Sequence, residues 1–196
     1  MRRLGGLHSP SALLLVLVNL IPLAGVVLFG WSVGALMLLY WMETVVIGVL
    51  NVPKILTAGM DSGGGWHRGG PVFIAAFFIV HFGGFNVGHF SFLRAFFDLP
   101  RVDTALMVSL GGLALSHAFS LFANWFGKGE YAGVSANAQM FKPYGRVAVM
   151  HVVILVGGVL SEALGAPVMA LALLVALKTA MDLRAHARSH RAASPA

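Results

Sequence analysis

Four histidines and one glutamate lie inside long hydrophobic stretches of this chain, and their side chains can do chemistry there. The histidines are His81, His89, His117 and His151, and the glutamate is Glu43. Ionisable groups at membrane depth are costly, and they usually face a protein interior or a water-filled cavity. Imidazole and carboxylate groups bind transition metals, and histidines from different helices can also hold a b-type haem. These five residues are therefore candidate ligands of a transition metal or a haem.

A second interpretation is a proton or ion path, because histidine exchanges protons near physiological pH. Four polar residues share helical faces with Glu43 or His117, and two more form an i, i+4 pair near the end of the last span; all six would orient ligands or line such a path. They are Tyr40, Asn51, Lys54, Asn124, Lys178 and Asp182. Transport of a proton, an ion or a small solute through an oligomer is thus one alternative to metal binding. A structural membrane subunit is another.

The composition identifies the setting of these residues. Of the 196 residues, 58% are hydrophobic and only 10% are charged, whereas an ordinary soluble domain is about 25% charged. Apolar stretches recur from end to end, which predicts an all-α membrane protein with several spans. The chain has no cysteine. This excludes disulfides, thiolate metal sites, covalently attached haem and cysteine nucleophiles.

Windows of about 20 apolar residues predict six transmembrane helices in a single domain, 1–196. The predicted spans are 11–30, 33–57, 72–97, 104–127, 145–163 and 166–184. A long loop over 128–144 mixes small, polar and aromatic residues, and it either lies on the membrane surface or folds under the bundle. With a rise of about 1.5 Å per residue, His81, His117 and His151 lie at one level, about 20 Å from the outer boundary. Glu43 lies about 15 Å and His89 about 10 Å from that boundary.

The distribution of positive charge predicts the orientation. If the N-terminus is cytoplasmic, eleven of the 13 lysines and arginines lie on the cytoplasmic side, and only Arg94 and Arg101 lie outside. This bias predicts cytoplasmic termini in a protein of the cytoplasmic (inner) membrane. The net charge of +6 is then explained by topology rather than by nucleic-acid binding. The basic tail, 185–196, is expected to meet anionic lipid headgroups. A homo-oligomer is a further expectation.

Three sequence blocks resemble a family of small prokaryotic membrane proteins that is known only as a domain of unknown function. The first contains Tyr40-Trp41-x-Glu43, and the second contains His81-Phe82-Gly83-Gly84-Phe85 with His89. The third contains Pro143-Tyr144-Gly145-Arg146-Val147 with His151, and it is followed by Lys178 and Asp182. The resemblance covers most of the chain from the second predicted span onward. It implies that Glu43, His81, His89 and His151 form one set, to which His117 does not belong.

A weaker resemblance is to rhomboid-type intramembrane proteases, which have six helices and a serine in a Gly-x-Ser-Gly motif. Here Gly133-Val134-Ser135-Ala136 is similar, but the last glycine is absent. Ser135 also falls in the predicted loop rather than in a span. A rhomboid-like hydrolase is therefore the remaining alternative. The preferred interpretation is a site with Glu43, His81, His117 and His151 as ligands and His89 as a substitute or supporting residue.

Overall fold

The computed structural model describes residues 10–60 and 69–192, and every regular element in these ranges is a helix. The long helices are α1 (Pro10–Phe29), α2 (Val33–Thr57), α3 (Gly69–Phe96), α4 (Thr104–Ser120) and α8 (Val168–Ala192). Between α4 and α8 lie the shorter elements η1 (Leu121–Phe126), η2 (Glu130–Gly133), α5 (Ala136–Phe141), α6 (Tyr144–Val152), η3 (Val153–Gly157) and α7 (Gly158–Leu164). The prediction of an all-α fold is confirmed.

Short polar residues define where several helices begin. Ser32 caps α2 by accepting a hydrogen bond from the Ala35 amide, and Asp103 caps α4 by accepting one from the Leu106 amide at 2.8 Å. Such caps satisfy amides that have no partner within the helix. Gly165 ends α7 in the left-handed conformation, with φ of 61°, which glycine adopts without strain. These local signals separate the helices at turns of only a few residues.

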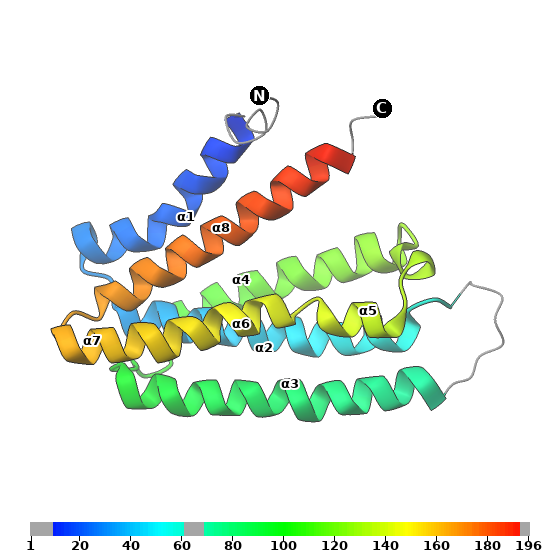
Figure 1. Ribbon diagram of the computed structural model, residues 1–196, viewed down its shortest axis with the longest axis horizontal. Coiled ribbons are helices and arrows are strands. Elements are labelled where there is room, and N and C mark those ends of the chain that lie inside the picture. Colours follow the sequence, from blue (N-terminus) through cyan, green and yellow to red (C-terminus); the bar gives the residue numbers. More distant parts are fainter. Residues whose placement is uncertain (1–9, 61–68, 193–196) are drawn as a thin grey trace.

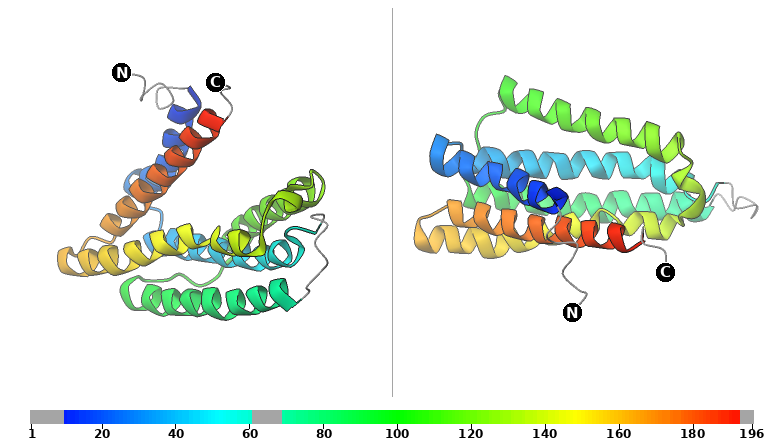
Figure 2. Two further views of the ribbon diagram at one scale, coloured as in Figure 1. Left: turned by 45° about the vertical axis from the view of Figure 1, so that its right-hand side comes forward. Right: turned by 90° about the horizontal axis from the view of Figure 1, so that it is seen from above.

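The helices α1, α2, α3 and α4 run in alternating directions, the run from α5 to α7 returns, and α8 again runs in the direction of α2 and α4, with α2 at the centre of the arrangement (Figure 1). The helix α2 packs against α3, α4 and α5, whereas α1 packs against α8. The α1–α8 pair leans away from the other helices, as Figure 2 shows. Helices α5, α6 and α7 follow one another as a nearly continuous run beside α2 and α3. The predicted loop at 128–144 is thus largely ordered as η2 and α5, and α5 lies against the bundle.

Two hydrophobic clusters stabilise the two ends of the bundle. One is built around Met37 and Met150 and continues into α8. The other is built around Ile55 and Phe82 and includes Met140 of α5. Because Met37 and Ile55 belong to different clusters, the intervening part of α2, which carries Glu43, lies between them. The polar site described below is therefore held from both sides by apolar packing.

Four helical segments are long and apolar enough to cross a membrane: Val33–Thr57, Gly70–Phe96, Thr104–Phe126 and Ala136–Leu164. A shorter apolar segment covers Val168–Met181. Large hydrophobic side chains such as Phe73, Val80, Leu115 and Phe119 are exposed on the outside of these segments. Apolar helices with an apolar outer surface are compatible with a membrane protein.

Gly48 allows α2 and α3 to approach closely, and this contact gives a stability prediction. A Cβ atom at Gly48 would overlap the ring of Phe82, which stacks on Phe78 at 4.7 Å between ring centroids. We expect Gly48→Ala to destabilise the protein by about 1–3 kcal/mol through overpacking. The midpoint of thermal unfolding in detergent measures this effect.

Gly112→Ala is the matched control, because Gly112 lies inside α4 with open space where its Cβ would be. An alanine there is expected to be neutral or to stabilise the helix by up to about 1 kcal/mol. Equal unfolding midpoints for the two variants would contradict the close contact at Gly48.

Candidate functional site

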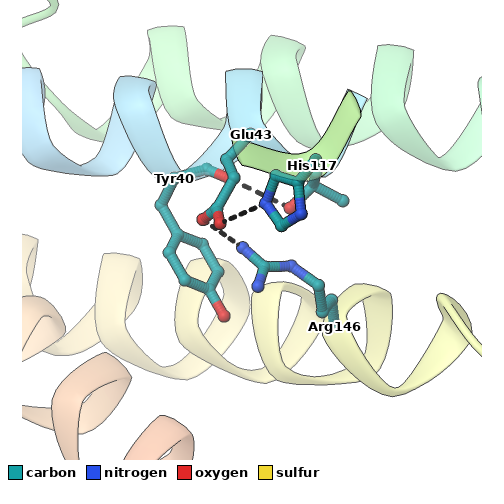
Figure 3. Close-up of polar contacts among 5 residues, drawn as sticks. Tyr40, Glu43, His117 and Arg146 are labelled. Carbon is teal, nitrogen blue, oxygen red and sulfur yellow. Dashed lines mark hydrogen bonds and ion pairs between the residues drawn. The ribbon is translucent and has the colours of Figure 1, made fainter. Parts of the chain in front are cut away.

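The carboxylate of Glu43 is shared by a histidine and an arginine from two other helices. His117 Nε2 donates to Glu43 Oε1 at 3.0 Å, and Arg146 Nη2 donates to Glu43 Oε2 at 2.5 Å. Glu43 comes from α2, His117 from α4 and Arg146 from α6, and their side chains point toward one another (Figure 3). The exposed fractions of these side chains are 15% for Glu43, 33% for His117 and 21% for Arg146. We call these three residues the Glu43 cluster.

Tyr40 completes the surroundings of Arg146. It lies one turn before Glu43 on α2, and the centroid of its ring is 4.5 Å from the guanidinium carbon of Arg146 (Figure 3). A cation over an aromatic face is attracted by the ring, more strongly where water is excluded. Arg146 Nε is buried and has no hydrogen-bond partner among the described residues. Ring stacking and the carboxylate therefore hold the guanidinium in place.

A buried amide pair fixes α5 against α2. Gln139 Nε2 donates to Asn51 Oδ1 at 2.6 Å, and Asn51 Nδ2 donates to the Gln139 backbone oxygen at 3.3 Å. Both residues are at most 4% exposed. Asn51, which the sequence suggested as an orienting residue, thus orients α5. This placement brings the following residues, Lys142 to Arg146, beside α2.

Two of the remaining predicted ligands form a separate contact. His89 Nε2 lies 3.3 Å from His151 Nδ1, between α3 and α6. His89 is 3% exposed and its Nδ1 has no partner among the described residues, whereas His151 is exposed. His81 is exposed and lies in a third place, where its Nδ1 is 2.8 Å from the Tyr144 hydroxyl. The His89–His151 contact and the His81–Tyr144 contact are therefore separate from each other and from the Glu43 cluster.

The five predicted ligands do not converge on one point. Glu43 pairs with His117, His89 pairs with His151, and His81 contacts Tyr144. Across residues 10–60 and 69–192, no group of three or more histidines, aspartates or glutamates is placed to hold a metal. The single metal or haem site expected from the sequence therefore has no support in this arrangement.

The other predicted polar residues lie around the cluster rather than in it. Asn124 Nδ2 donates to Ser120 Oγ at 3.2 Å, one turn back on the same helical segment. Lys178 lines an apolar cavity of about 200 Å³ together with Tyr40 and Glu43. The side chain of Asp182 and those of the basic tail lie outside the described residues, so the predicted Lys178–Asp182 pair is not addressed.

A second cavity of about 200 Å³ is lined by two members of the Glu43 cluster, His117 and Arg146. Its lining combines apolar residues with the basic residues Lys54, Lys142 and Arg146. Trp125 lies beside it, with the ammonium groups of Lys54 and Lys142 at 5.5 and 5.6 Å from its ring. Trp125 is buried, and its indole N–H donates to the Thr57 hydroxyl at 2.9 Å. His117 and Arg146 thus connect the Glu43 carboxylate to a basic cavity.

Sequence reasoning missed Arg146, Tyr144 and Gln139 as members of these contacts. Arg146 was interpreted only as a flanking charge that fixes topology, because it follows a presumed loop. The signal that points to it is the Pro143-Tyr144-Gly145-Arg146 block, which begins the helix that also carries His151. Two short π-helical segments, η1 and η3, follow His117 and His151 within four residues. Such segments often occur at functional sites.

A family profile matches the chain over residues 1–196, and the family is described as one of unknown function, DUF6498. The chain belongs to DUF6498. This agrees with the expectation of a domain of unknown function, and the rhomboid resemblance is not confirmed. In this DUF6498 chain, Ser135 caps α5 by accepting a hydrogen bond from the Ala138 amide. Neither the curated proteins nor the solved structures compared with the chain include a match.

The energetic coupling within the Glu43 cluster is testable by a double-mutant cycle. We expect Glu43→Gln and Arg146→Gln to be non-additive by about 1–3 kcal/mol, because each single change leaves a charge without its partner. The free energy of unfolding in mixed micelles gives the four values. Lys128→Gln is the control partner, since Lys128 is exposed and belongs to no ion pair in the described part of the chain. Additivity of Glu43→Gln with Arg146→Gln would contradict the contact.

Proposed function

We propose that this protein spans the cytoplasmic membrane six times with both termini in the cytoplasm. Support comes from the four segments that are long and apolar enough to span, together with the flanking helices α1 and α8. The alternating helix directions bring the end of α2, the end of η1 and the junction of α5 with α6 to one end of the bundle, opposite the turn between α3 and α4 (Figure 1). The first end carries Lys54, Lys128 and Lys142, and the α3–α4 end carries Arg94 and Arg101. A positive end is expected on the cytoplasmic side.

Within this frame, the proposed function is proton-linked transport of a small solute, centred on the Glu43 cluster. The observation that carries the proposal is one carboxylate bonded to both a histidine and an arginine, where Glu43 lines one cavity and its two partners line another. Ionisable residues inside a membrane commonly mark proton or ion pathways. The apolar cavity and the basic cavity would provide access from opposite directions.

The chemistry of such a cluster follows from its charges. With neutral His117, the negative charge of Glu43 and the positive charge of Arg146 cancel. A proton on His117 would add a second cation that competes with Arg146 for the same carboxylate. Histidine suits this role because it exchanges protons within the physiological range. Since Arg146 also lines the basic cavity, protonation would change the charge that a bound solute meets.

Proton flux in proteoliposomes tests this proposal. We expect the protein to increase proton entry under an imposed membrane potential, measured with an enclosed pH-sensitive dye. Glu43→Gln should reduce this flux by tenfold or more, because it removes the shared negative charge. Glu162→Gln is the matched control, since Glu162 is exposed on α7 and should leave the flux unchanged. Flux no greater than in empty liposomes, or flux unaffected by Glu43→Gln, would refute proton transport.

A second candidate function is transition-metal binding by His89 and His151. The distance between their facing nitrogens is 3.3 Å. Two imidazole ligands on a tetrahedral zinc, each at about 2.0–2.1 Å, are separated by about 3.3–3.4 Å. The unpartnered Nδ1 of His89 adds a buried polar atom that needs a neighbour. Water molecules, or the same pair from a second copy of the chain, would supply the remaining ligands.

Titration of the purified protein with Zn²⁺ and Co²⁺ tests this second function. We expect saturable binding of one ion for every one or two chains, and a visible spectrum of tetrahedral Co²⁺. His89→Ala and His151→Ala should each abolish binding. His81→Ala should retain it, because His81 contacts Tyr144 instead. Absence of saturable binding, or equal loss in all three variants, would exclude a site at the His89–His151 pair.

A further inference from the structure

The basic cavity beside the Glu43 cluster has the features of an anion site, and we call it the basic cleft. Its polar lining comes from three separate parts of the chain: α2, α4 and the junction of α5 with α6. The residues used below are Asn51, Lys54, His117, Ser120, Lys142 and Arg146. No acidic residue is among the described residues that line the cleft.

Positive charge in the basic cleft exceeds the negative charge that could neutralise it. Three cations line it, and Glu43 beside it supplies one carboxylate, which pairs with Arg146. Lys54 and Lys142 form no ion pair within 4.0 Å among the described residues, and both ammonium groups lie against Trp125 instead. Glu130 of η2 acts on Lys54 only at longer range. Two lysines are thus held close together with like charge and without a carboxylate partner.

Such an arrangement costs electrostatic energy unless an anion is present. Like charges repel, and the amide pair Asn51–Gln139 holds α5 so that the exposed Lys142 stays near the half-buried Lys54. A phosphate group offers several oxygens to two ammonium groups and a guanidinium at once. Ser120 Oγ already accepts from Asn124, so its own hydroxyl hydrogen is available to a ligand.

The size of the basic cleft limits what it can hold. Its volume of about 200 Å³ is below the about 300–1,000 Å³ of sites for larger organic ligands. A free phosphate or the phosphate of a lipid headgroup is small enough for a cleft of about 200 Å³. Ile47 and Leu50 on its wall, and Trp125 beside it, would suit the apolar part of a lipid next to its headgroup.

We propose that the basic cleft binds a phosphate group, presented by an anionic lipid headgroup or by free phosphate. The inference goes beyond proton transport, because it requires binding but no proton movement. Lys54 and Lys142 supply the attraction, Arg146 contacts the phosphate from the side of Glu43, and Ser120 donates a hydrogen bond.

Calorimetric titration of the full-length protein in a neutral detergent tests this inference at constant pH. The probes are inorganic phosphate, a short-chain phosphatidylglycerol and a short-chain phosphatidylcholine. We expect saturable binding of phosphatidylglycerol or of inorganic phosphate, at least tenfold tighter than that of phosphatidylcholine. Binding of phosphatidylglycerol alone would identify the lipid headgroup, whereas binding of inorganic phosphate would identify the phosphate group itself.

Variants of the two lysines locate the binding. Lys54→Gln with Lys142→Gln should weaken binding at least tenfold, and Lys54→Arg with Lys142→Arg should retain it and shows that the fold tolerates change there. Lys128→Gln removes one exposed positive charge near the same end and should change the affinity less than twofold. Binding of neither anion, or equal weakening by Lys128→Gln, would overturn the inference. If the unmodified protein binds phosphate but shows no proton flux, only the transport proposal is refuted.

Discussion

The carboxylate of Glu43 is the interaction on which the arrangement of the central helices depends. It bonds α2 to α4 through His117 and to α6 through Arg146, so one side chain joins three segments that are far apart in sequence. In the segment that contains α4, only 11% of the most apolar stretch is buried in the protein, the smallest share among the four long apolar segments. Apolar packing alone therefore holds α4 weakly. Taking Glu43 and Arg146 out of water is costly, and the cost is offset only while both remain paired.

Further contacts along α2 position the helices that form the basic cleft. Gly48 lets α3 approach, Asn51 holds α5 through Gln139, and Thr57 accepts a hydrogen bond from Trp125. These three contacts follow Glu43 along α2 at intervals of one to two turns. The position of Arg146 is consequently determined twice, by the carboxylate and by the tethered α5. Because the planar guanidinium is already oriented, it loses little side-chain entropy when it forms a hydrogen bond.

Helix class and helix positions follow from the sequence, because apolar windows and short polar caps are local signals. The range predicted for the second helix, 33–57, matches α2, and two of the candidate residues, Glu43 and His117, contact each other. The number of membrane spans stays a prediction. Arg146 was not predicted as a site residue, because its role depends on a segment that folds back against α2 through Gln139. A pattern of neighbouring residues in the sequence does not predict a contact between residues 88 positions apart.

The histidines of α3 show why face assignment alone does not define a site. His81 and His89 are eight residues apart, which is about 80° around a helix. That angle leaves His81 exposed beside Tyr144 and buries His89 against His151. Side chains at one depth can thus belong to different interfaces. Depth and face identify which residues are costly to bury, but the crossing of the helices decides which of them meet.

Arg146 belongs both to the Glu43 cluster and to the basic cleft, so the proposed proton transport and the proposed phosphate binding share one charge. An anion in the basic cleft and the Glu43 carboxylate would compete for the same guanidinium. Binding of the anion would weaken the hold of Arg146 on Glu43, and a protonated His117 would then be the better partner for the carboxylate. The reverse also holds by thermodynamic linkage, because a ligand that favours one pairing is itself favoured by it. A proton on His117 and an anion in the basic cleft would therefore promote each other's binding.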